Sequence, residues 1–381
     1  MRLLHVFGPI VLLLGVPLPA VAQSTPAASS PTAASGDFTG LVDIGGGRQL
    51  WLECAGQGSP TILLEAGFRT RADLWSDDLI QPEAPRTMVL PGVAAFTRVC
   101  AYDRPGTTTV TEGTLLPSRS DPVAMPRTAD ESVHDLHALL AAAAVPGPYV
   151  LVGHSYGGML MRLYASTYPD EVVGMVLVDA FSEGLEEQMT PEQWTAYTEI
   201  FQPVPEVLAG YADLEFTDLD LSVAQVREAT AAVPLPPRPQ SPGVPFPLVV
   251  LSRGQPMAMP ADLPGGLTGE GLERAWTAEQ DRLAALLPDA RHVIASESEH
   301  YIQLQQPELV IAAVQQVVAA VRDPSSWATS TPSTPSPLLA VLSHGSAADA
   351  TRHSRLANRP VEMDTAVGLV FPSARHGCMM R

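Results

Sequence analysis

Residues 149–158 read Tyr-Val-Leu-Val-Gly-His-Ser-Tyr-Gly-Gly, and this stretch decides the fold of the chain. An apolar run typical of a buried strand ends in Gly-x-Ser-x-Gly, and residues 159–167 then have the composition of a helix. A serine at such a corner is held on a tight turn with its hydroxyl exposed, while the flanking glycines let the backbone pass closely. Ser155 is therefore the candidate nucleophile. The alternative is a glycine-rich turn without chemistry.

A serine hydroxyl is a poor nucleophile at neutral pH. It needs a base within hydrogen-bond reach and a third group that orients the base. Among the nine histidines, only His300 lies in a loop after a late strand, from which it can reach back across the edge of a sheet. The sequence therefore predicts His300 as the base.

The acid is expected at Asp179, which ends the strand after the serine helix. Parallel strands end at one edge of a sheet, so Asp179 is expected beside the serine, accepting the second N–H of His300. Residues 251–255 end the next strand but offer no carboxylate. Asp262 and Glu297 are rival candidates, and a simple strand-end turn at Asp179 is the structural alternative.

An acyl-transfer enzyme also needs backbone N–H groups aimed at the oxyanion. Residues 65–68 read Glu-Ala-Gly-Phe directly after a short buried strand, and the glycine lets this turn present the N–H of Phe68. The residue after the nucleophile, Tyr156, is expected to supply the other donor. Asp103, in an Asp-Arg-Pro-Gly turn before the serine, is interpreted as structural.

Strand and helix patterns alternate along the middle of the chain, which predicts a mostly parallel sheet covered by helices on both faces. Residues 180–246 break this alternation and are expected to form a helical lid over the strand ends. Residues 107–125 are expected to be a long polar loop. The expected strands are 49–54, 61–64, 96–102, 149–154, 172–178, 247–251 and 291–295, and the clearest helices are 128–145, 190–200, 270–287 and 307–321.

Four stretches together resemble the α/β-hydrolase fold family, particularly its esterase-like bacterial branch: residues 64–68, 100–106, 153–158 and 300–304. The resemblance covers roughly residues 38–321. It implies an eight-stranded sheet, a helical lid after the sixth strand and no cofactor. The chain departs from the family in two places. Many relatives have His-Gly at the positions of Ala66-Gly67, and many place the acid after the strand that here ends at Leu251.

The ends of the chain differ from this domain, which is expected to span residues 38–322. Residues 1–22 have a positive start, an apolar run and a small-residue cleavage site, which predicts a signal peptide rather than a membrane anchor. Residues 23–37 read as a Ser/Thr/Pro/Ala linker and residues 323–381 as a disordered tail. We therefore expect a secreted, periplasmic or cell-surface protein with no membrane span in the mature chain.

Charge and cysteines limit the partners. The net charge is −19, which would repel phosphate backbones and argues against nucleic-acid binding. The three cysteines have no metal-ligand spacing. Cys54 and Cys100 both lie in strand-like stretches, where a disulfide and two buried thiols are equally compatible with the sequence. Cys378 lies in the tail.

Together these features predict a secreted serine hydrolase, most simply a carboxylesterase that cleaves small or medium apolar esters through an acyl-enzyme. Other reactions on the same scaffold are the alternative: amide, lactone or C–C bond hydrolysis, or perhydrolysis. A non-catalytic ligand-binding module is a further alternative of a different class. Neither a cofactor nor a metal is expected.

Overall fold

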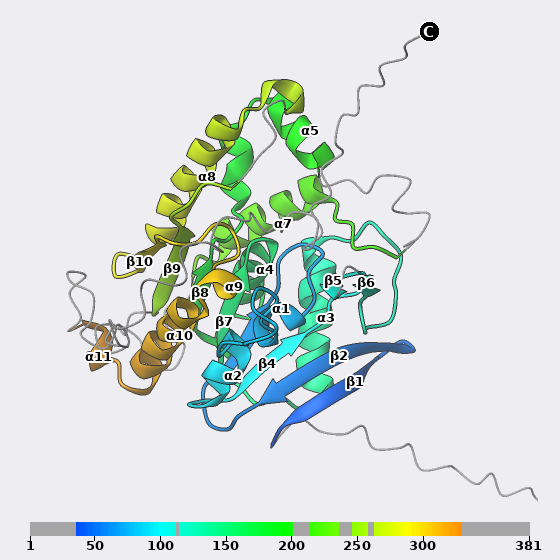
Figure 1. The fold of residues 1–381 in the computed structure, drawn as a ribbon, viewed down its shortest axis with the longest axis vertical. Coiled ribbons are helices and arrows are strands. Elements are labelled where there is room, and N and C mark those ends of the chain that lie inside the picture. Colours follow the sequence, from blue (N-terminus) through cyan, green and yellow to red (C-terminus); the bar gives the residue numbers. More distant parts are fainter. Residues whose placement is uncertain (1–35, 112–113, 201–212, 236–245, 258–262, 329–381) are drawn as a thin grey trace, which may run out of the picture.

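An eight-stranded sheet runs through the molecule in the order β1-β2-β4-β3-β7-β8-β9-β10 (Figure 1). This computed structural model describes residues 36–111, 114–200, 213–235, 246–257 and 263–328. Strands β3, β4, β7, β8, β9 and β10 are parallel, and β2 pairs antiparallel with both β1 and β4. The predicted mostly parallel sheet is confirmed. Its strands are β1 (Phe38–Gly45), β2 (Arg48–Ala55), β3 (Thr61–Glu65), β4 (Val99–Tyr102), β7 (Tyr149–His154), β8 (Val172–Val178), β9 (Leu248–Arg253) and β10 (Arg291–Ala295).

Helices cover both faces of the sheet, as Figure 1 shows. Helices α3, α4 and α8 contribute to the core on one face. Helices α2 and α10 contribute to the core on the other face. The helices are α1 (Asp73–Ser76), α2 (Val89–Ala94), α3 (Ala129–Ala142), α4 (Tyr156–Thr167), α5 (Pro191–Ile200), α7 (Leu219–Ala232), α8 (Gly269–Ala284), α9 (Ile302–Gln305), α10 (Pro307–Arg322) and α11 (Ser325–Ala328).

Strand β7 explains why the central strands are apolar throughout. Tyr149 and Leu151 pack into the core beneath α3 and α4, whereas Val150 and Val152 pack into the core beneath α10. Successive side chains of a strand point to opposite faces, so a strand covered on both sides needs apolar residues at every position. This two-sided burial fixes the strand that carries Ser155 in the middle of the molecule.

The parallel strands end at one edge, and their register brings the candidate site residues together. His154, the last residue of β7, pairs with Val178 at the end of β8. Val178 in turn pairs with Leu251 of β9. Ser155 and Asp179 therefore follow directly at neighbouring positions on this edge.

Residues 180–246, which we call the cap segment, connect β8 to β9. They contain a 3-10 helix at Glu183–Gln188, then α5 and α7. The part of the cap segment just before α7 is fixed to the main domain, because the N–H of Arg127 donates to the carbonyl of Phe216 at 2.8 Å. The position of this segment after the sixth strand of the main sheet agrees with the resemblance. Residues 201–212 and 236–245 lie outside the described residues.

Two boundaries differ from the sequence expectations. The expected polar loop 107–125 contains a two-stranded hairpin, β5 (Thr108–Thr111) and β6 (Thr114–Pro117). The ordered structure also continues past residue 322 into α11. Trp327 explains this extension, because its side chain is buried and the guanidinium of Arg291 lies 3.8 Å from its ring centre. Residues 1–35 and 329–381, and with them the expected signal peptide, most of the linker and most of the tail, lie outside the described residues.

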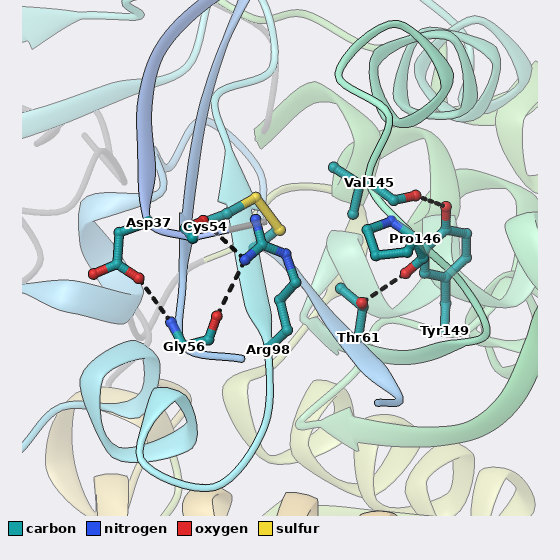
Figure 2. The surroundings of a disulfide bond; sticks show 10 residues. Asp37, Cys54, Gly56, Thr61, Arg98, Val145, Pro146 and Tyr149 are labelled. Carbon is teal, nitrogen blue, oxygen red and sulfur yellow. Dashed lines mark hydrogen bonds between the residues drawn. A yellow bond between two sulfur atoms is a disulfide. The ribbon is translucent and has the colours of Figure 1, made fainter. Parts of the chain in front are cut away.

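Cys54 and Cys100 form a disulfide between β2 and β4, where they are direct partners in the antiparallel register. Figure 2 shows its surroundings, in which Arg98 donates to the carbonyl of Gly56 at 3.1 Å. The bridge thus joins the antiparallel edge of the sheet to the parallel part. Cys378 lies outside the described residues. Within the described ranges, no helix combines the length and hydropathy needed to cross a bilayer.

Candidate active site

Ser155 occupies a strained turn between β7 and α4. Its φ is 51° and its ψ is −125°, a conformation that a residue with a Cβ adopts at an energetic cost. The flanking glycines make the turn possible. A Cβ at Gly153 would lie 2.5 Å from the carbonyl oxygen of Gly157, and one at Gly157 would lie 2.5 Å from the carbonyl oxygen of Ala66. The local geometry is therefore the one expected for Gly-x-Ser-x-Gly.

His300 and Asp179 are joined by a hydrogen bond, although they are far apart in sequence. Nδ1 of His300 lies 2.6 Å from Oδ2 of Asp179. An ionised carboxylate only accepts hydrogen bonds, so Nδ1 carries the proton and Nε2 is the basic nitrogen of the neutral ring. This is the orientation that a general base needs when it faces a hydroxyl.

Asp179 is fully buried and accepts further hydrogen bonds from two residues. Arg253 donates from Nη1 to Oδ2 at 2.7 Å and from its backbone N–H to Oδ1 at 3.2 Å. Trp276 donates from Nε1 to Oδ1 at 3.1 Å. Burial alone would raise the pKa of Asp179, but the hydrogen bond from His300 and the charge of Arg253 outweigh it and hold the pKa well below its usual range. The carboxyl group is therefore ionised at neutral pH.

The loop that carries His300 is fixed to the end of β9. The N–H groups of Gly254 and Gln255 donate to the carbonyl of Ser298 at 3.1 and 3.0 Å. The ring of His300 is buried and meets the ring of Trp276 edge-on, with 5.5 Å between their centres. Main-chain hydrogen bonds and ring packing thus hold the imidazole in place before any substrate binds.

Ser155 and His300 line one cavity of about 300 Å³. Residues of the cap segment form part of its wall, including Tyr197 and Phe216. Trp194, another aromatic residue of this segment, stacks on Tyr197. The cavity is mainly apolar, and its aromatic lining residues are Phe68, Tyr156, Phe181, Tyr197, Phe216 and Trp276.

The residues expected to supply the oxyanion donors both lie near the serine. Tyr156 begins α4, and Phe68 lies in the turn after β3. This turn passes close to the serine, because a Cβ at Gly67 would lie 3.3 Å from Cβ of Ser155. Phe68 and Tyr156 both line the cavity, and their ring centres are 6.0 Å apart. Both candidate residues therefore lie beside the cavity that Ser155 lines.

The rival acids are not at this position. Glu297 is exposed, and its backbone N–H is bound by the side chain of Gln306, whereas Asp262 lies outside the described residues. Asp103 is buried and accepts from Arg119 at 2.7 Å and from the N–H of Ala72 at 3.0 Å, in agreement with a structural role.

His154, next to the serine, points away from the proton path. It is buried, and its Nε2 lies 3.0 Å from the carbonyl oxygen of His300. A carbonyl accepts, so Nε2 donates. Burial holds the pKa of His154 well below its usual value, and the ring is neutral. His154 therefore supports the backbone of residue 300 and does not titrate at neutral pH.

The sequence did not reveal the role of Arg253 and Trp276. Like His300, these two residues donate hydrogen bonds to Asp179. Arg253 lies at the end of β9, where the sequence offers no carboxylate, and its role was therefore hidden. The available signal was a charged residue at the end of an apolar strand. Among the residues that the structure describes, none of the expected polar loop 107–125 lines the cavity. The next residue, Pro126, does. Within the same residues, no three His, Cys, Asp or Glu side chains are grouped to hold a metal ion.

Comparisons with known proteins identify the family of the chain. Residues 62–381 match the model of a family described as "Alpha/beta hydrolase family". The chain is 32% identical over 191 residues to a probable transporter of Hormonema carpetanum, covering 48% of this chain and 24% of that protein. It is 31% identical over 124 residues to the uncharacterized protein YqjL of Bacillus subtilis, covering 32% of this chain and 41% of that one. The chain thus spans less than half the length of either relative.

Among solved structures, Cfl2 from Burkholderia cenocepacia is similar in fold. Its TM-score is 0.50 at 18% identity, over 77% of this chain and 100% of that one. The family match extends over most of the sequence, from β3 onward, and includes the serine turn, Asp179 and His300. The chain belongs to the alpha/beta hydrolase family.

Proposed function

We propose that this protein is a serine hydrolase that cleaves small or medium apolar carboxylic esters. The observation that carries the proposal is the 2.6 Å hydrogen bond between Asp179 and His300, because His300 and Ser155 line the same cavity. A buried carboxylate, an imidazole with a fixed tautomer and an alcohol on a strained turn are the three groups that nucleophilic acyl transfer requires.

In this mechanism, Oγ of Ser155 attacks the ester carbonyl carbon while Nε2 of His300 takes the hydroxyl proton. The N–H groups of Phe68 and Tyr156 stabilise the oxyanion. The intermediate collapses, and His300 returns the proton to the departing alcohol. Water, deprotonated by the same nitrogen, then cleaves the acyl-enzyme. Asp179 stays ionised throughout and stabilises the imidazolium, which agrees with its lowered pKa.

The cavity supports a substrate of limited size. Its volume of about 300 Å³ lies at the lower end of the range for ligand sites, and aromatic side chains dominate its wall. We therefore expect acetyl and butyryl esters to be better substrates than esters with long acyl chains. A panel of p-nitrophenyl esters with acyl chains of graded length measures this preference.

Replacing the nucleophile tests the function itself. Ser155→Ala is expected to reduce kcat for p-nitrophenyl butyrate by more than about 1,000-fold, because no other group can form the acyl-enzyme. Ser166→Ala is the matched control, since this serine of α4 donates to the carbonyl of Val233 and does not line the cavity. Turnover by the Ser155 variant at the wild-type rate would refute the proposal.

We also propose that the protein is exported. The signal-like residues 1–22 and the Cys54–Cys100 disulfide support this, because disulfides persist mainly in oxidising compartments. Expression of the full chain in a bacterial host, followed by fractionation, should find a shortened protein outside the cytoplasm. Deletion of residues 2–22 should retain it in the cytoplasm. Retention of the full-length chain in the cytoplasm would contradict the proposal.

A further inference from the structure

Arg104 lies buried between two carboxylates beneath the turn that carries Phe68. Its Nε donates to Oε1 of Glu215 at 2.6 Å, and its Nη1 donates to Glu65, which also accepts from the hydroxyl of Tyr102 at 2.6 Å. Glu65, Arg104 and Glu215 are 1%, 3% and 4% exposed. Such buried ion pairs are often no more stabilising than apolar residues of the same size, so stability alone does not account for the cluster.

The same guanidinium binds the backbone of the turn. Nη1 of Arg104 donates to the carbonyl of Ala66 at 2.8 Å, and Nη2 donates to the carbonyl of Gly67 at 2.7 Å. Thr70 adds two bonds to the Gly67 carbonyl, from its N–H at 3.2 Å and from its hydroxyl at 2.9 Å. Two successive carbonyl groups are thus held on the side of the turn where Arg104 lies.

Peptide geometry links these bonds to the oxyanion donor. The carbonyl of Gly67 and the N–H of Phe68 belong to one planar trans peptide, so they point in opposite directions. Holding the carbonyl toward Arg104 therefore fixes the N–H of Phe68 on the opposite side. Rotation of this peptide would withdraw the donor.

Glu215 extends this anchor to the cap segment. Its Oε2 accepts from the N–H of Arg69 at 2.5 Å, and its own N–H donates to the carbonyl of Gly106 at 2.8 Å. Arg69 has a φ of 60°, a backbone conformation that needs support in a residue with a Cβ. One residue of the cap segment thus neutralises Arg104 and holds the next peptide of the turn.

We propose that Arg104 is a positioning residue that aims the Phe68 N–H at the oxyanion, and that Glu215 makes this aim depend on the docked cap segment. The proposal rests on the proposed serine hydrolase function. Arg104 acts only through the backbone, so its loss should weaken binding of the transition state more than binding of the substrate.

Arg104→Lys tests the proposal, because a single ammonium group cannot bond to Glu65, Glu215 and both carbonyls in the planar fork of a guanidinium. We expect kcat for p-nitrophenyl butyrate to fall about 10- to 100-fold with little change in KM. This fall is smaller than the one expected when an oxyanion donor is removed altogether. Arg162→Lys is the matched control. It alters another buried arginine–glutamate pair, with Glu183, away from the turn, and should leave kcat unchanged.

Thr70→Val supplies a neutral test that does not disturb the buried charges. It removes one hydrogen bond from the Gly67 carbonyl at nearly constant volume, and we expect kcat to fall about 2- to 10-fold. Glu215→Gln replaces the carboxylate by an uncharged amide of the same shape. It should lower kcat less than Arg104→Lys does. If Arg104→Lys does not fold, the threonine and glutamate variants decide the question.

A trifluoromethyl ketone with a butyl chain distinguishes positioning from a merely structural role. The serine oxygen adds to its carbonyl carbon and gives an oxyanion that needs the same donors. Its inhibition constant should rise in parallel with the loss of kcat/KM across the variants, while inhibition by butanol stays constant. If folded variants kept the wild-type kcat and ketone affinity, or changed in KM alone, this inference would be overturned. The proposed serine hydrolase function would still stand. An inactive wild-type protein would instead refute the proposed function.

Discussion

At the residue scale, the most informative side chain is Arg253, because it shares Oδ2 of Asp179 with His300. The distances to this oxygen are 2.7 Å from Arg253 and 2.6 Å from His300. Arg253 also binds Glu273, at 2.8 Å from Nη2, which balances part of its charge. The arginine fixes the carboxylate but places a positive charge beside the imidazole. The charge of Arg253 also helps to hold the pKa of Asp179 well below its usual range.

Arg253→Gln should therefore lower kcat/KM for p-nitrophenyl butyrate by about 10-fold, because Asp179 loses a charged hydrogen-bond donor and holds the imidazole less firmly. The amide can still donate to Asp179. Rates of p-nitrophenyl butyrate hydrolysis at neutral pH measure the loss. Arg274→Gln, at an exposed ion pair with Glu270, is the control. Wild-type kcat/KM in Arg253→Gln would show that the arginine is not needed to hold Asp179 in place.

His154 predicts a pH dependence of stability. Burial lowers its pKa in the folded state, so below the unfolded value of about 6.5 the unfolded chain gains a proton that the folded chain does not. The stability that this group contributes is complete above about pH 6.5 and is lost as the pH falls, by up to about 1.4 kcal/mol per pH unit. The sign follows from the lowered pKa.

Urea unfolding of the wild type and of His154→Gln between pH 5 and 7.5 checks this. The free energy of unfolding of the variant should fall less steeply below pH 6.5, by about one proton, and the exposed His134→Gln should behave as the wild type. Identical slopes for wild type and His154→Gln would mean that His154 takes up a proton in the folded protein.

At the element scale, the start of helix α4 is packed directly against the end of strand β3. A Cβ at Gly157 would lie 2.5 Å from the carbonyl oxygens of both Glu65 and Ala66. These two elements carry the two candidate oxyanion donors, Tyr156 and Phe68. The distance between the donors therefore depends on a contact that only glycine allows.

Gly157→Ala is expected to push α4 and β3 apart. Overpacking of this kind typically costs about 1–3 kcal/mol of stability, and we expect a fall in kcat of at least about 10-fold because the donors separate. Thermal unfolding and kcat for p-nitrophenyl butyrate measure both effects. Gly40→Ala in β1 is the control, since the nearest neighbour of its Cβ beyond the adjacent residues would be a side-chain carbon of Phe38 at an ordinary 3.7 Å. Wild-type activity of Gly157→Ala would contradict this packing argument.

At the scale of the whole molecule, the Cys54–Cys100 disulfide joins positions 46 residues apart and closes a loop that contains β3 and the turn with Phe68. Cross-linking a loop of this length removes unfolded-state entropy worth about 4 kcal/mol in the simplest model. The bridge lies on the sheet away from the cavity lining, so it is expected to stabilise the fold without taking part in the reaction.

The double variant Cys54→Ala/Cys100→Ala should lose about 2–4 kcal/mol in the free energy of unfolding and keep kcat at 25 °C. Urea unfolding of purified protein, with the wild type in reducing buffer for comparison, gives the stability. A loss of kcat in a fully folded variant would show that the bridge also shapes the active site.

Much of this architecture was predictable because it depends on local pattern. Continuous apolar runs such as residues 149–152 indicate buried parallel strands, and parallel strands end at one edge, which placed Asp179 beside Ser155. The contacts of Arg104 with Glu215 and of Arg253 with Asp179 were not predictable. They join segments 111 and 74 residues apart, and no periodicity encodes which buried charges meet. The disulfide stayed open for the same reason, since it depends on the register of β2 on β4.

The most direct test of the central claim is to identify the residue that a fluorophosphonate labels. One phosphonylated site, Ser155, is expected in the peptide map of the wild-type protein, because only an activated serine displaces fluoride rapidly. Labelling should be slowed strongly in His300→Gln and be unchanged in His137→Gln, whose histidine stacks on Tyr168 away from the cavity. An unlabelled Ser155, or labelling that proceeds equally fast without His300, would contradict the proposed roles of these two residues.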